Sequence, residues 1–272
     1  MTTNLPKLIG LTGATISPDG TVTAGTARVG KDTVGAILVD EYGYRRISVA
    51  DNIRTAALGL DPIIDGDRRL SEIVDNLGWE QAKAIPEVRR TLQRLGTEAG
   101  TDVHGQSLWL DLVGSQIDAD STETPVVITD VRMPHELDWI RARGGLVWEV
   151  RRPVDNLLTS ENSAHASERR AGEPDVVVNN DSTLDALADA VAAALVSSMV
   201  ETFVVEATGG IEMPSFQAFG RGQAHLARAR FDEFATDLRP DEYGDRVDLL
   251  AISNGQITLL ESATVDDNDD ED

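Results

Sequence analysis

Two glycines, a lysine and a hydroxyl residue are closely spaced in the segment Gly25-Thr-Ala-Arg-Val-Gly-Lys-Asp-Thr33, a pattern close to the phosphate-binding loop (P-loop). Glycine lets the backbone curl so that successive N–H groups point at one anion, and a helix that starts there adds its positive end. Lys31 would add a mobile point charge for outer phosphates, which makes it a candidate catalytic residue. The loop is expected to comprise Gly25, Ala27, Arg28, Val29 and Gly30, and behind Lys31 a magnesium ion would be reached by Asp32 and Thr33, directly or through water.

The flanking sequence fits the order of strand, glycine loop and helix that this pattern requires. Residues 8–12 are a short apolar run of the buried-strand type, and residues 34–42 show helical spacing before a stop at Gly43. Residues 14–24 intervene and indicate a small hairpin with its turn at Pro18-Asp19-Gly20. Either Gly13 or Gly25 would then end the strand, and a plain glycine-rich turn is the alternative to a phosphate loop.

An acidic and a basic residue follow the next predicted strand, at 44–49. Asp51 and Arg54 lie at its tip, where ligands bind in open α/β sheets, and both are candidate substrate-binding residues. Asp51 as the cap of a helix over 53–60 is an equally good interpretation, and the two roles are compatible.

A helix predicted over 87–99 gathers basic and polar residues on adjacent turns. It follows a polar loop expected at 61–69 and a helix expected at 70–79. A solvated face is the alternative to a binding face here. The candidate substrate-binding residues are Gln93, Arg94 and Thr97.

The strongest buried strand, at 125–130, ends in Asp130, and Arg132 follows. A strand that ends in Asp is typical of the second magnesium-side carboxylate of phosphate-loop proteins, and Arg132 could meet a transferring phosphoryl group. The alternative is that Asp130 caps the following helix. A further strand at 146–150 leads into Arg151 and Arg152, and the polar residues 155–174 indicate a mobile flap.

The elements that position these residues alternate between strand and helix over 8–200. About five short apolar strands, the last at 175–179, are separated by helices. This alternation predicts the α/β class, with an open, mostly parallel sheet flanked by helices.

Composition limits the class of protein. The 272 residues carry a formal net charge of −23, which disfavours binding to nucleic-acid polymers or anionic membranes. The chain has no cysteine, so neither disulfides nor thiolate metal sites are expected. No signal peptide or long apolar span is evident, so a soluble cytoplasmic protein is expected. A phosphorylated substrate would need a local cluster of Arg and Lys.

In order and spacing, these segments resemble the bacteriophage deoxynucleoside monophosphate kinases over about residues 5–198. The resemblance is carried by Lys7-Leu-Ile-Gly-Leu-Thr-Gly, Gly30-Lys-Asp-Thr-Val, Val49-Ala-Asp with Arg54, Leu92-Gln-Arg-Leu-Gly-Thr-Glu, Thr129-Asp-Val-Arg-Met-Pro-His-Glu, and His165-Ala-Ser-Glu with Pro174-Asp-Val-Val-Val-Asn-Asn. It implies a nucleoside monophosphate kinase fold with a core sheet, a monophosphate-binding helical region and a closing lid. The implied reaction transfers the γ-phosphoryl of ATP to a deoxynucleoside monophosphate with Mg²⁺, giving ADP and the diphosphate, in the cytoplasm of an infected bacterial host.

The resemblance also implies roles by position. Lys31 and the loop amides would hold the β and γ phosphates, and Arg132 would lie beside the transferred phosphoryl group. Arg151, on the ATP side, and Arg152 would lead into the lid. The monophosphate-binding part would contain Asp51, Arg54, Gln93, Arg94 and Thr97. Asp32 is expected in this family, whereas the hairpin at 14–24 is a departure from it.

The C-terminal residues lie outside the resemblance. A kinase domain is expected over 1–200, a small α+β module over 201–261 and a disordered acidic tail over 262–272. Strands at 202–207, 246–252 and 256–260 and a helix at 223–235 would form the module, whose role as a packing or dimerising appendage is favoured over a catalytic or regulatory one. A homodimer is compatible with this reading. Two alternative functions remain: a kinase of another small phosphorylated acceptor, and a nucleotide-binding regulatory module without turnover.

Overall fold

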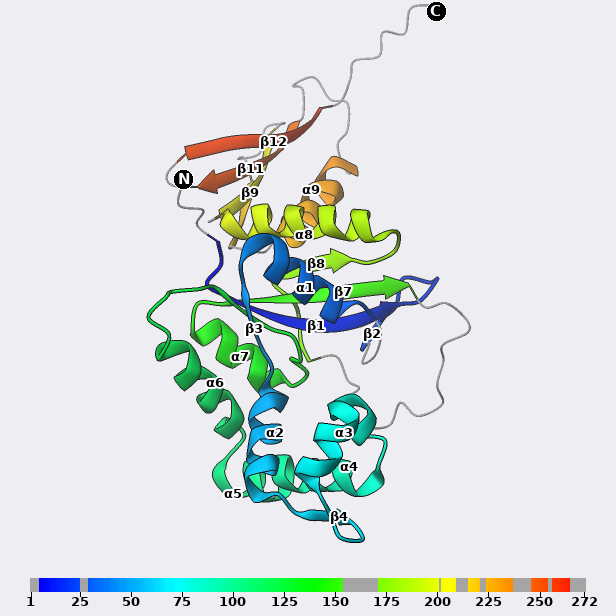
Figure 1. Cartoon of the computed structure of the whole chain (residues 1–272). Coiled ribbons are helices and arrows are strands. Elements are labelled where there is room, and N and C mark those ends of the chain that lie inside the picture. Colours follow the sequence, from blue (N-terminus) through cyan, green and yellow to red (C-terminus); the bar gives the residue numbers. More distant parts are fainter. Residues whose placement is uncertain are drawn as a thin grey trace, which may run out of the picture.

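Five parallel strands form the main sheet of the computed structural model, in the order β3-β6-β1-β7-β8 (Figure 1). Their bounds are Leu8–Ile16 for β1, Arg45–Ile47 for β3, Val126–Ile128 for β6, Leu146–Pro153 for β7 and Val176–Asn179 for β8. Both faces of the sheet are covered, which explains the apolar runs of the central strands β1 and β6 and of the first residues of β7. The expected fold class, a mostly parallel sheet flanked by helices, is confirmed.

The structure describes residues 5–24, 29–153, 171–200, 202–208, 215–220, 224–236, 246–253 and 256–264. Three of the expected loop residues, Gly25, Ala27 and Arg28, lie outside this part of the chain, and so does most of the expected flap. No helix in the described ranges is long and apolar enough to cross a membrane.

Helices bury both faces of the main sheet (Figure 1). Helices α1 (Lys31–Tyr42) and α8 (Leu184–Met199) pack on one face, where Leu38 and Leu195 meet Trp148 of β7 in the larger core. Helices α6 (Leu108–Asp118) and α7 (Pro134–Ala142) pack on the other face, where Val113 and Ile140 join a second core. Alternate residues of β7 therefore serve two different cores, as the two-residue period of a strand dictates.

The hairpin predicted at 14–24 is present, and it is an extension of β1. The strand continues through Gly13 to Ile16, turns, and returns as β2 (Val22–Ala24), so Gly13 does not end it. Because Ala24 is paired with Ala14, the last residue of the hairpin lies beside its first residue. The insertion therefore delivers the following segment to the end of the main sheet.

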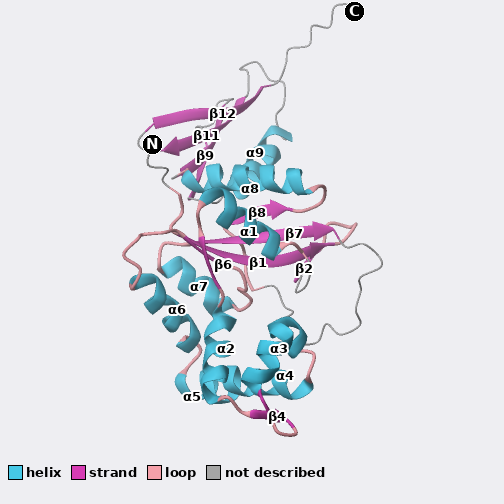
Figure 2. Cartoon of the chain, in the orientation of Figure 1, coloured by secondary structure: helices cyan, strands magenta, loops and turns pink. Residues whose placement is uncertain are grey.

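A group of helices and a two-stranded hairpin, here called the helical unit (residues 49–104), lies below the sheet in Figure 2. Its elements are α2 (Val49–Leu60), β4 (Ile63–Asp65), β5 (Arg68–Arg69), α3 (Leu70–Ala82), α4 (Pro86–Gln93), the π-helix η1 (Arg94–Thr101) and α5 (Asp102–His104). The prediction of a loop at 61–69 is wrong, because these residues form the β4–β5 hairpin, which turns at Gly66. Such short strands give no alternation that a sequence pattern could reveal.

The helix predicted over 87–99 changes type partway. It is an α-helix only to Gln93 and then continues as the π-helix η1, with wider turns. Two glycines allow close packing there: a Cβ on Gly96 would lie 3.0 Å from Ile53, and one on Gly100 would lie 2.8 Å from Trp109. The indole N–H of Trp109 donates to the carbonyl of Gly96 at 2.8 Å, which secures the π-helix against α6.

The C-terminal part forms a second, antiparallel sheet in the order β10-β9-β11-β12. Its elements are β9 (Thr202–Thr208), β10 (Ser215–Gly220), α9 (Ala224–Thr236), β11 (Arg246–Ser253) and β12 (Gln256–Thr264). Strand β10 was not predicted, and residues 262–264 belong to β12 and not to the expected tail. Residues 265–272 lie outside the described chain. Helix α9 packs on its own sheet and also contacts β8.

We predict that a chain ending at Val200 folds, because β9 pairs with β10 and β11 and not with the main sheet. Loss of the α9–β8 contact should lower the unfolding midpoint by about 2–4 °C for each kcal/mol lost. Thermal unfolding is compared with a chain ending at Thr264. An insoluble shorter chain beside a folded longer one would show that residues 201–264 belong to the same folding unit as the main sheet.

Candidate active site

The carboxyl ends of the parallel strands open onto a cavity of about 1180 Å³. Each strand contributes a residue to its wall: Lys31 after the β1–β2 hairpin, Ser48 after β3, Asp130 after β6, Arg152 near the end of β7 and Asn180 after β8. We call this wall the sheet side. Its location agrees with the general position of ligand sites in open α/β sheets.

The opposite wall, here called the helical side, comes from the helical unit. It is formed by Ile53, Arg54, Glu80, Lys83, Arg89, Leu92, Gln93, Gly96, Thr97, Thr101 and Asp102. The cavity thus lies between two separately packed parts of the fold. It is also larger than the roughly 300–1,000 Å³ typical of a pocket for one small molecule.

The cavity is basic although the chain is acidic. Seven Lys and Arg side chains and five carboxylates line it, in a protein whose formal net charge is −23. The local cluster of cations that a phosphorylated substrate would need is therefore present, and it divides between the two walls. Lys31, Arg46, Arg132 and Arg152 lie on the sheet side, and Arg54, Lys83 and Arg89 lie on the helical side.

Lys31 begins α1 directly after Gly30, whose φ of 103° is a conformation that favours glycine. Burial lowers the pKa of Lys31, the nearby charge of Arg132 lowers it further, and Asp32 and Asp130 partly oppose these effects. No ion pair joins Lys31 or Arg132 to a carboxylate within the described residues. A bound anion would relieve the repulsion between these two cations, so this corner of the cavity is suited to a phosphate.

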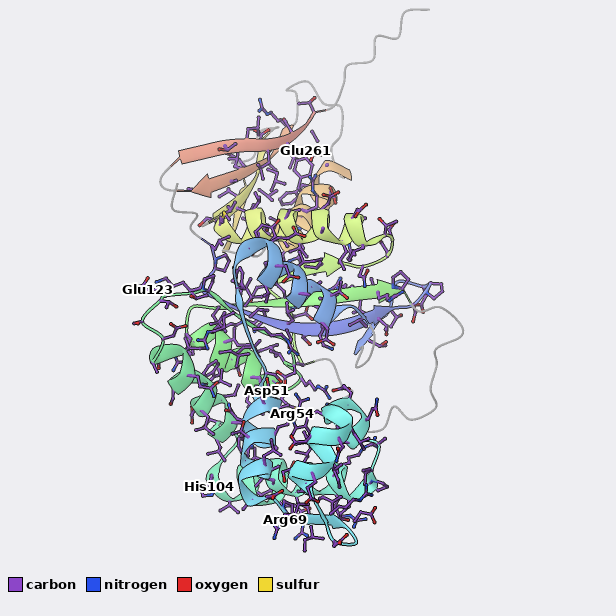
Figure 3. All side chains as sticks on the ribbon, in the orientation of Figure 1. Asp51, Arg54, Arg69, His104, Glu123 and Glu261 are labelled. Atoms are coloured by element: carbon purple, nitrogen blue, oxygen red, sulfur yellow. The ribbon has the colours of Figure 1, made fainter. Side chains whose placement is uncertain are left out.

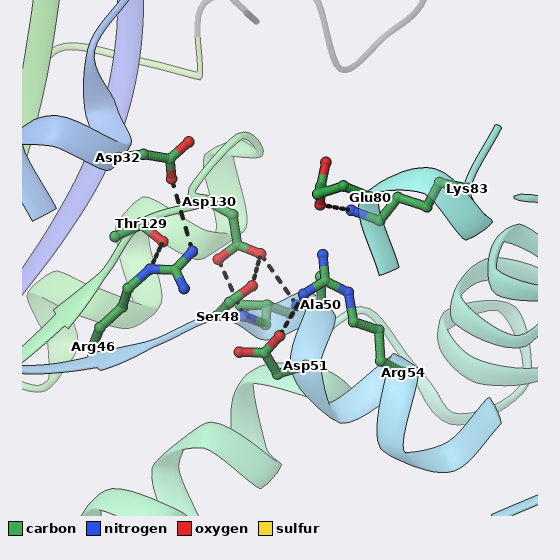
Figure 4. Close-up of polar contacts among 11 residues, drawn as sticks. Asp32, Arg46, Ser48, Ala50, Asp51, Arg54, Glu80, Lys83, Thr129 and Asp130 are labelled. Carbon is green, nitrogen blue, oxygen red and sulfur yellow. Dashed lines mark hydrogen bonds and ion pairs between the residues drawn. The ribbon is translucent and has the colours of Figure 1, made fainter. Parts of the chain in front are cut away.

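Asp130 holds the start of α2, as Figure 4 shows. Its carboxylate accepts hydrogen bonds from Ser48 Oγ at 2.7 Å and from the backbone N–H groups of Val49 and Ala50 at 3.1 Å each. The expected alternative, that Asp130 caps the helix after it, does not describe the structure. Glu136 serves that helix, accepting from the N–H groups of Arg132 and Met133 at 2.6 and 2.8 Å.

The candidate magnesium residues Asp32, Thr33 and Asp130 all line the cavity. No group of three or more His, Cys, Asp or Glu side chains suited to a metal exists among the described residues. Two carboxylates are nevertheless enough for Mg²⁺, which usually keeps several waters and takes substrate phosphates as ligands. The donor set therefore fits magnesium better than a metal that needs a complete protein cage.

Arg46 was not selected from the sequence, yet it lies among these residues (Figure 4). Its guanidinium donates to Thr129 Oγ1 at 3.1 Å and lies 3.7 Å from the carboxylate of Asp32. Arg46 sits on β3, two residues before Ser48. The rule that ligands meet strand ends could have pointed to it.

The residues predicted for substrate binding fall into two groups. Arg54, Gln93 and Thr97 line the cavity, and Asp51 pairs with Arg54 at 2.7 Å at the end of α2 that faces the sheet (Figures 3 and 4). Arg94 does not line it; its side chain is 67% exposed and pairs with Glu98. Arg89, one turn earlier, does line it and has no ion pair within the described chain.

Two further ion pairs lie at or next to the walls of the cavity. On the helical side, Glu80 pairs with Lys83 at 2.8 Å, and neither residue was predicted from the sequence. Arg151 does not line the cavity, and it pairs with the fully buried Glu149 at 2.8 Å, whereas its neighbour Arg152 lies on the wall.

The family resemblance is confirmed by comparison with known proteins. Residues 66–191 match the sequence model of the deoxynucleotide monophosphate kinase family. The matched range begins after Lys31 and Arg54 and includes Arg89, Asp130, Arg132 and Asn180. No curated protein matches the chain.

A pH prediction follows from Glu136. Burial raises the pKa of its carboxyl group above the ordinary value of 4.5, and the two backbone hydrogen bonds only partly oppose this. The folded state therefore favours the protonated form, and this contribution to stability is present below pH 4.5 and lost as the pH rises. Glu136→Gln should thus be more stable relative to the parent chain at pH 7.5 than at pH 4.5.

Urea denaturation of both chains at the two pH values measures this effect. The control is Glu123→Gln, because the side chain of Glu123 is 78% exposed and its relative stability should depend little on pH. An equal or opposite pH dependence for the two variants would contradict the assignment.

Proposed function

Starting from the family match, we propose that this protein transfers the γ-phosphoryl group of ATP to a deoxynucleoside monophosphate and releases ADP and the deoxynucleoside diphosphate. The observation that carries the proposal is the pair of cationic walls across one cavity. A nucleotide-binding switch needs one anion site, whereas phosphoryl transfer between two phosphorylated molecules needs two. The cavity volume is also sufficient for two ligands.

The sheet side is proposed to bind ATP. The N–H groups around Gly30 and the start of α1 would hold the β and γ phosphates, and Lys31 would neutralise their charge. Arg132, which like Lys31 forms no ion pair within the part of the chain that the structure describes, would lie beside the group in transfer. Its positive charge would then matter most when charge develops on the transferring phosphoryl group.

The helical side is proposed to bind the monophosphate. Arg54 and Lys83 pair with Asp51 and Glu80, which lie three residues before them in the chain. A phosphate could exchange with these carboxylates at modest cost, because exposed ion pairs contribute only about 0–1 kcal/mol. Arg89 can bind without breaking a pair, so we propose it as the main phosphate ligand on this wall, with Gln93 and Thr97 nearby.

Magnesium, held by Asp32, Thr33 and Asp130, would supply charge neutralisation between the phosphates of ATP. The protein residues themselves need no covalent chemistry, since phosphoryl transfer depends on positioning and electrostatic stabilisation. The two walls satisfy this requirement by holding donor and acceptor in line. The residues expected to close over them, 155–174, belong mostly to the part of the chain outside the described ranges.

The direct test is a coupled ADP-release assay with ATP, Mg²⁺ and each of the four deoxynucleoside monophosphates. At least one acceptor should give turnover, and Lys31→Ala should lower it by about 100- to 1000-fold because one electrostatic contact to the transferring group is lost. Release of ADP with none of the four acceptors would refute the proposal. It would leave another phosphorylated acceptor or a regulatory role as the reading to pursue.

Two neighbouring arginines provide a matched test of the helical side. Arg89 lines the cavity, whereas Arg90 points away and pairs with Glu87 at 2.5 Å. Arg89→Ala should raise the KM for the monophosphate by about 10- to 100-fold, the loss of a charged hydrogen bond, and leave the KM for ATP unchanged.

Arg90→Ala is the control, because it removes the same charge from the same helix outside the cavity. Arg94→Ala tests the arginine that the sequence had favoured, and its KM for the monophosphate is compared with that of Arg89→Ala. A larger effect of Arg94→Ala than of Arg89→Ala would overturn the assignment of Arg89.

A further inference from the structure

Asn180 connects the end of β8 to the segment that carries Lys31. Its side-chain Nδ2 donates to the carbonyl oxygen of Val29 at 2.8 Å, although the two residues are 151 positions apart. Asn180 also lines the cavity. We propose that Asn180 is a positioning residue that orients the Val29–Gly30 peptide so that its N–H faces the bound phosphate. This inference rests on the proposed ATP site.

The orientation follows from the geometry of the peptide bond. In a trans peptide the C=O and the N–H point in opposite directions. With the Val29 carbonyl directed at Asn180, the N–H of Gly30 points away from Asn180. No described residue accepts a hydrogen bond from that N–H. Within the described part of the chain it is therefore a donor without an acceptor, at the start of α1 beside Lys31.

The conformation of Gly30 shows how closely Asn180 packs. A Cβ on Gly30 would lie 2.3 Å from Asn180 Nδ2, so the amide fills the space that any other side chain would need. Gly30 also has a φ of 103°, which L residues rarely adopt. The glycine and the asparagine therefore form one fitted pair, in which a side chain at position 30 would have to displace the amide of Asn180.

Asn180 is itself fixed. Its backbone N–H donates to the carbonyl of Arg151 at 2.7 Å, which ties it to β7. On the other side, Val29 is buried in the larger core with Trp148 and Val178. Burial of the Val29 side chain in the core fixes one side of the Val29–Gly30 peptide. The hydrogen bond from Asn180 to the Val29 carbonyl fixes its orientation. Without the amide donor, the peptide is free to rotate and its N–H can leave the phosphate.

The experiment measures binding of ATP with Mg²⁺ by calorimetry in the absence of any acceptor, using the full chain. Asn180→Ala should weaken ATP binding by about 3- to 10-fold, the loss of one hydrogen bond. Asn180→Asp keeps the size but sets an acceptor against the Val29 carbonyl, and it should weaken binding more. Asn179→Asp is the control, because it adds the same charge at an exposed neighbour outside the cavity.

A second measurement separates positioning from general structure. Labelling with ¹³C-carbonyl valine and ¹⁵N-glycine selects the three Val-Gly pairs of the chain, of which Val29–Gly30 is one. ATP should shift the Gly30 amide proton strongly in the parent chain and weakly in Asn180→Ala. The KM for the monophosphate should stay unchanged in every variant that folds. Should Asn180→Ala fail to fold, Asn180→Asp provides the same comparison.

The outcomes distinguish the two proposals. If the parent chain binds no ATP, the proposed function fails first. If the parent chain binds ATP and Asn180→Ala and Asn180→Asp bind it equally well with an unchanged Gly30 shift, the positioning role is refuted. Equal weakening by Asn179→Asp and Asn180→Asp would also refute it, because the effect would then be one of charge alone.

Discussion

The carboxylate of Asp130 joins the parallel sheet to the helical unit that faces it. It accepts three hydrogen bonds from the first residues of α2, and hydrogen bonds to a charged group contribute about 1.5–3 kcal/mol each. A negative charge at a helix N-terminus is also favourable for the helix dipole. Since α2 carries Arg54 and packs against α4 and η1, this contact helps to place the helical side relative to the sheet. A second connection is made by α6, which packs against α2 and η1 and donates from Trp109 to Gly96.

The same interaction explains how an acidic chain keeps a basic cavity. Asp130 is occupied by α2, Glu136 by the start of α7, and Asp51 and Glu80 by Arg54 and Lys83. Asp130 and Glu136 are hydrogen-bonded to backbone N–H groups, so, among the described residues, they are not paired with the cations of the cavity. Asp51 and Glu80 hold Arg54 and Lys83 in ion pairs that an incoming phosphate would replace. Lys31, Arg89 and Arg132, which form no ion pair with any residue in the described ranges, are distributed over both walls.

Sequence patterns located the sheet side well because its residues follow buried strands, whose apolar runs are easy to recognise. Lys31, Asp130 and Arg132 all reach the cavity for that reason. The helical side was harder, because several arginines lie on adjacent turns there and the family resemblance selected Arg94. In the structure the residues that line the cavity follow one stripe of the helix, which begins with Arg89, and the exposed Arg94 lies beside that stripe. Asn180 lies in the segment 174–180 that carries the family resemblance, but no sequence pattern indicated its contact with Val29, because the two residues are 151 positions apart.

The hairpin of β1 and β2 returns the chain to the residues at which the insertion begins, because Ala24 is paired with Ala14. Beyond that pair, β1 continues beside β7 to Ile16, and Thr15 is paired with Arg152 of the cavity wall. Residues could therefore be added at the turn beyond Ile16 without changing the strand pairs next to the site. The turn at Asp19 and Gly20 is exposed and hydrogen-bonded within itself through Ser17 and Thr21. It is therefore a natural place to attach a fluorophore or an affinity tag that reports on the protein from outside its working parts.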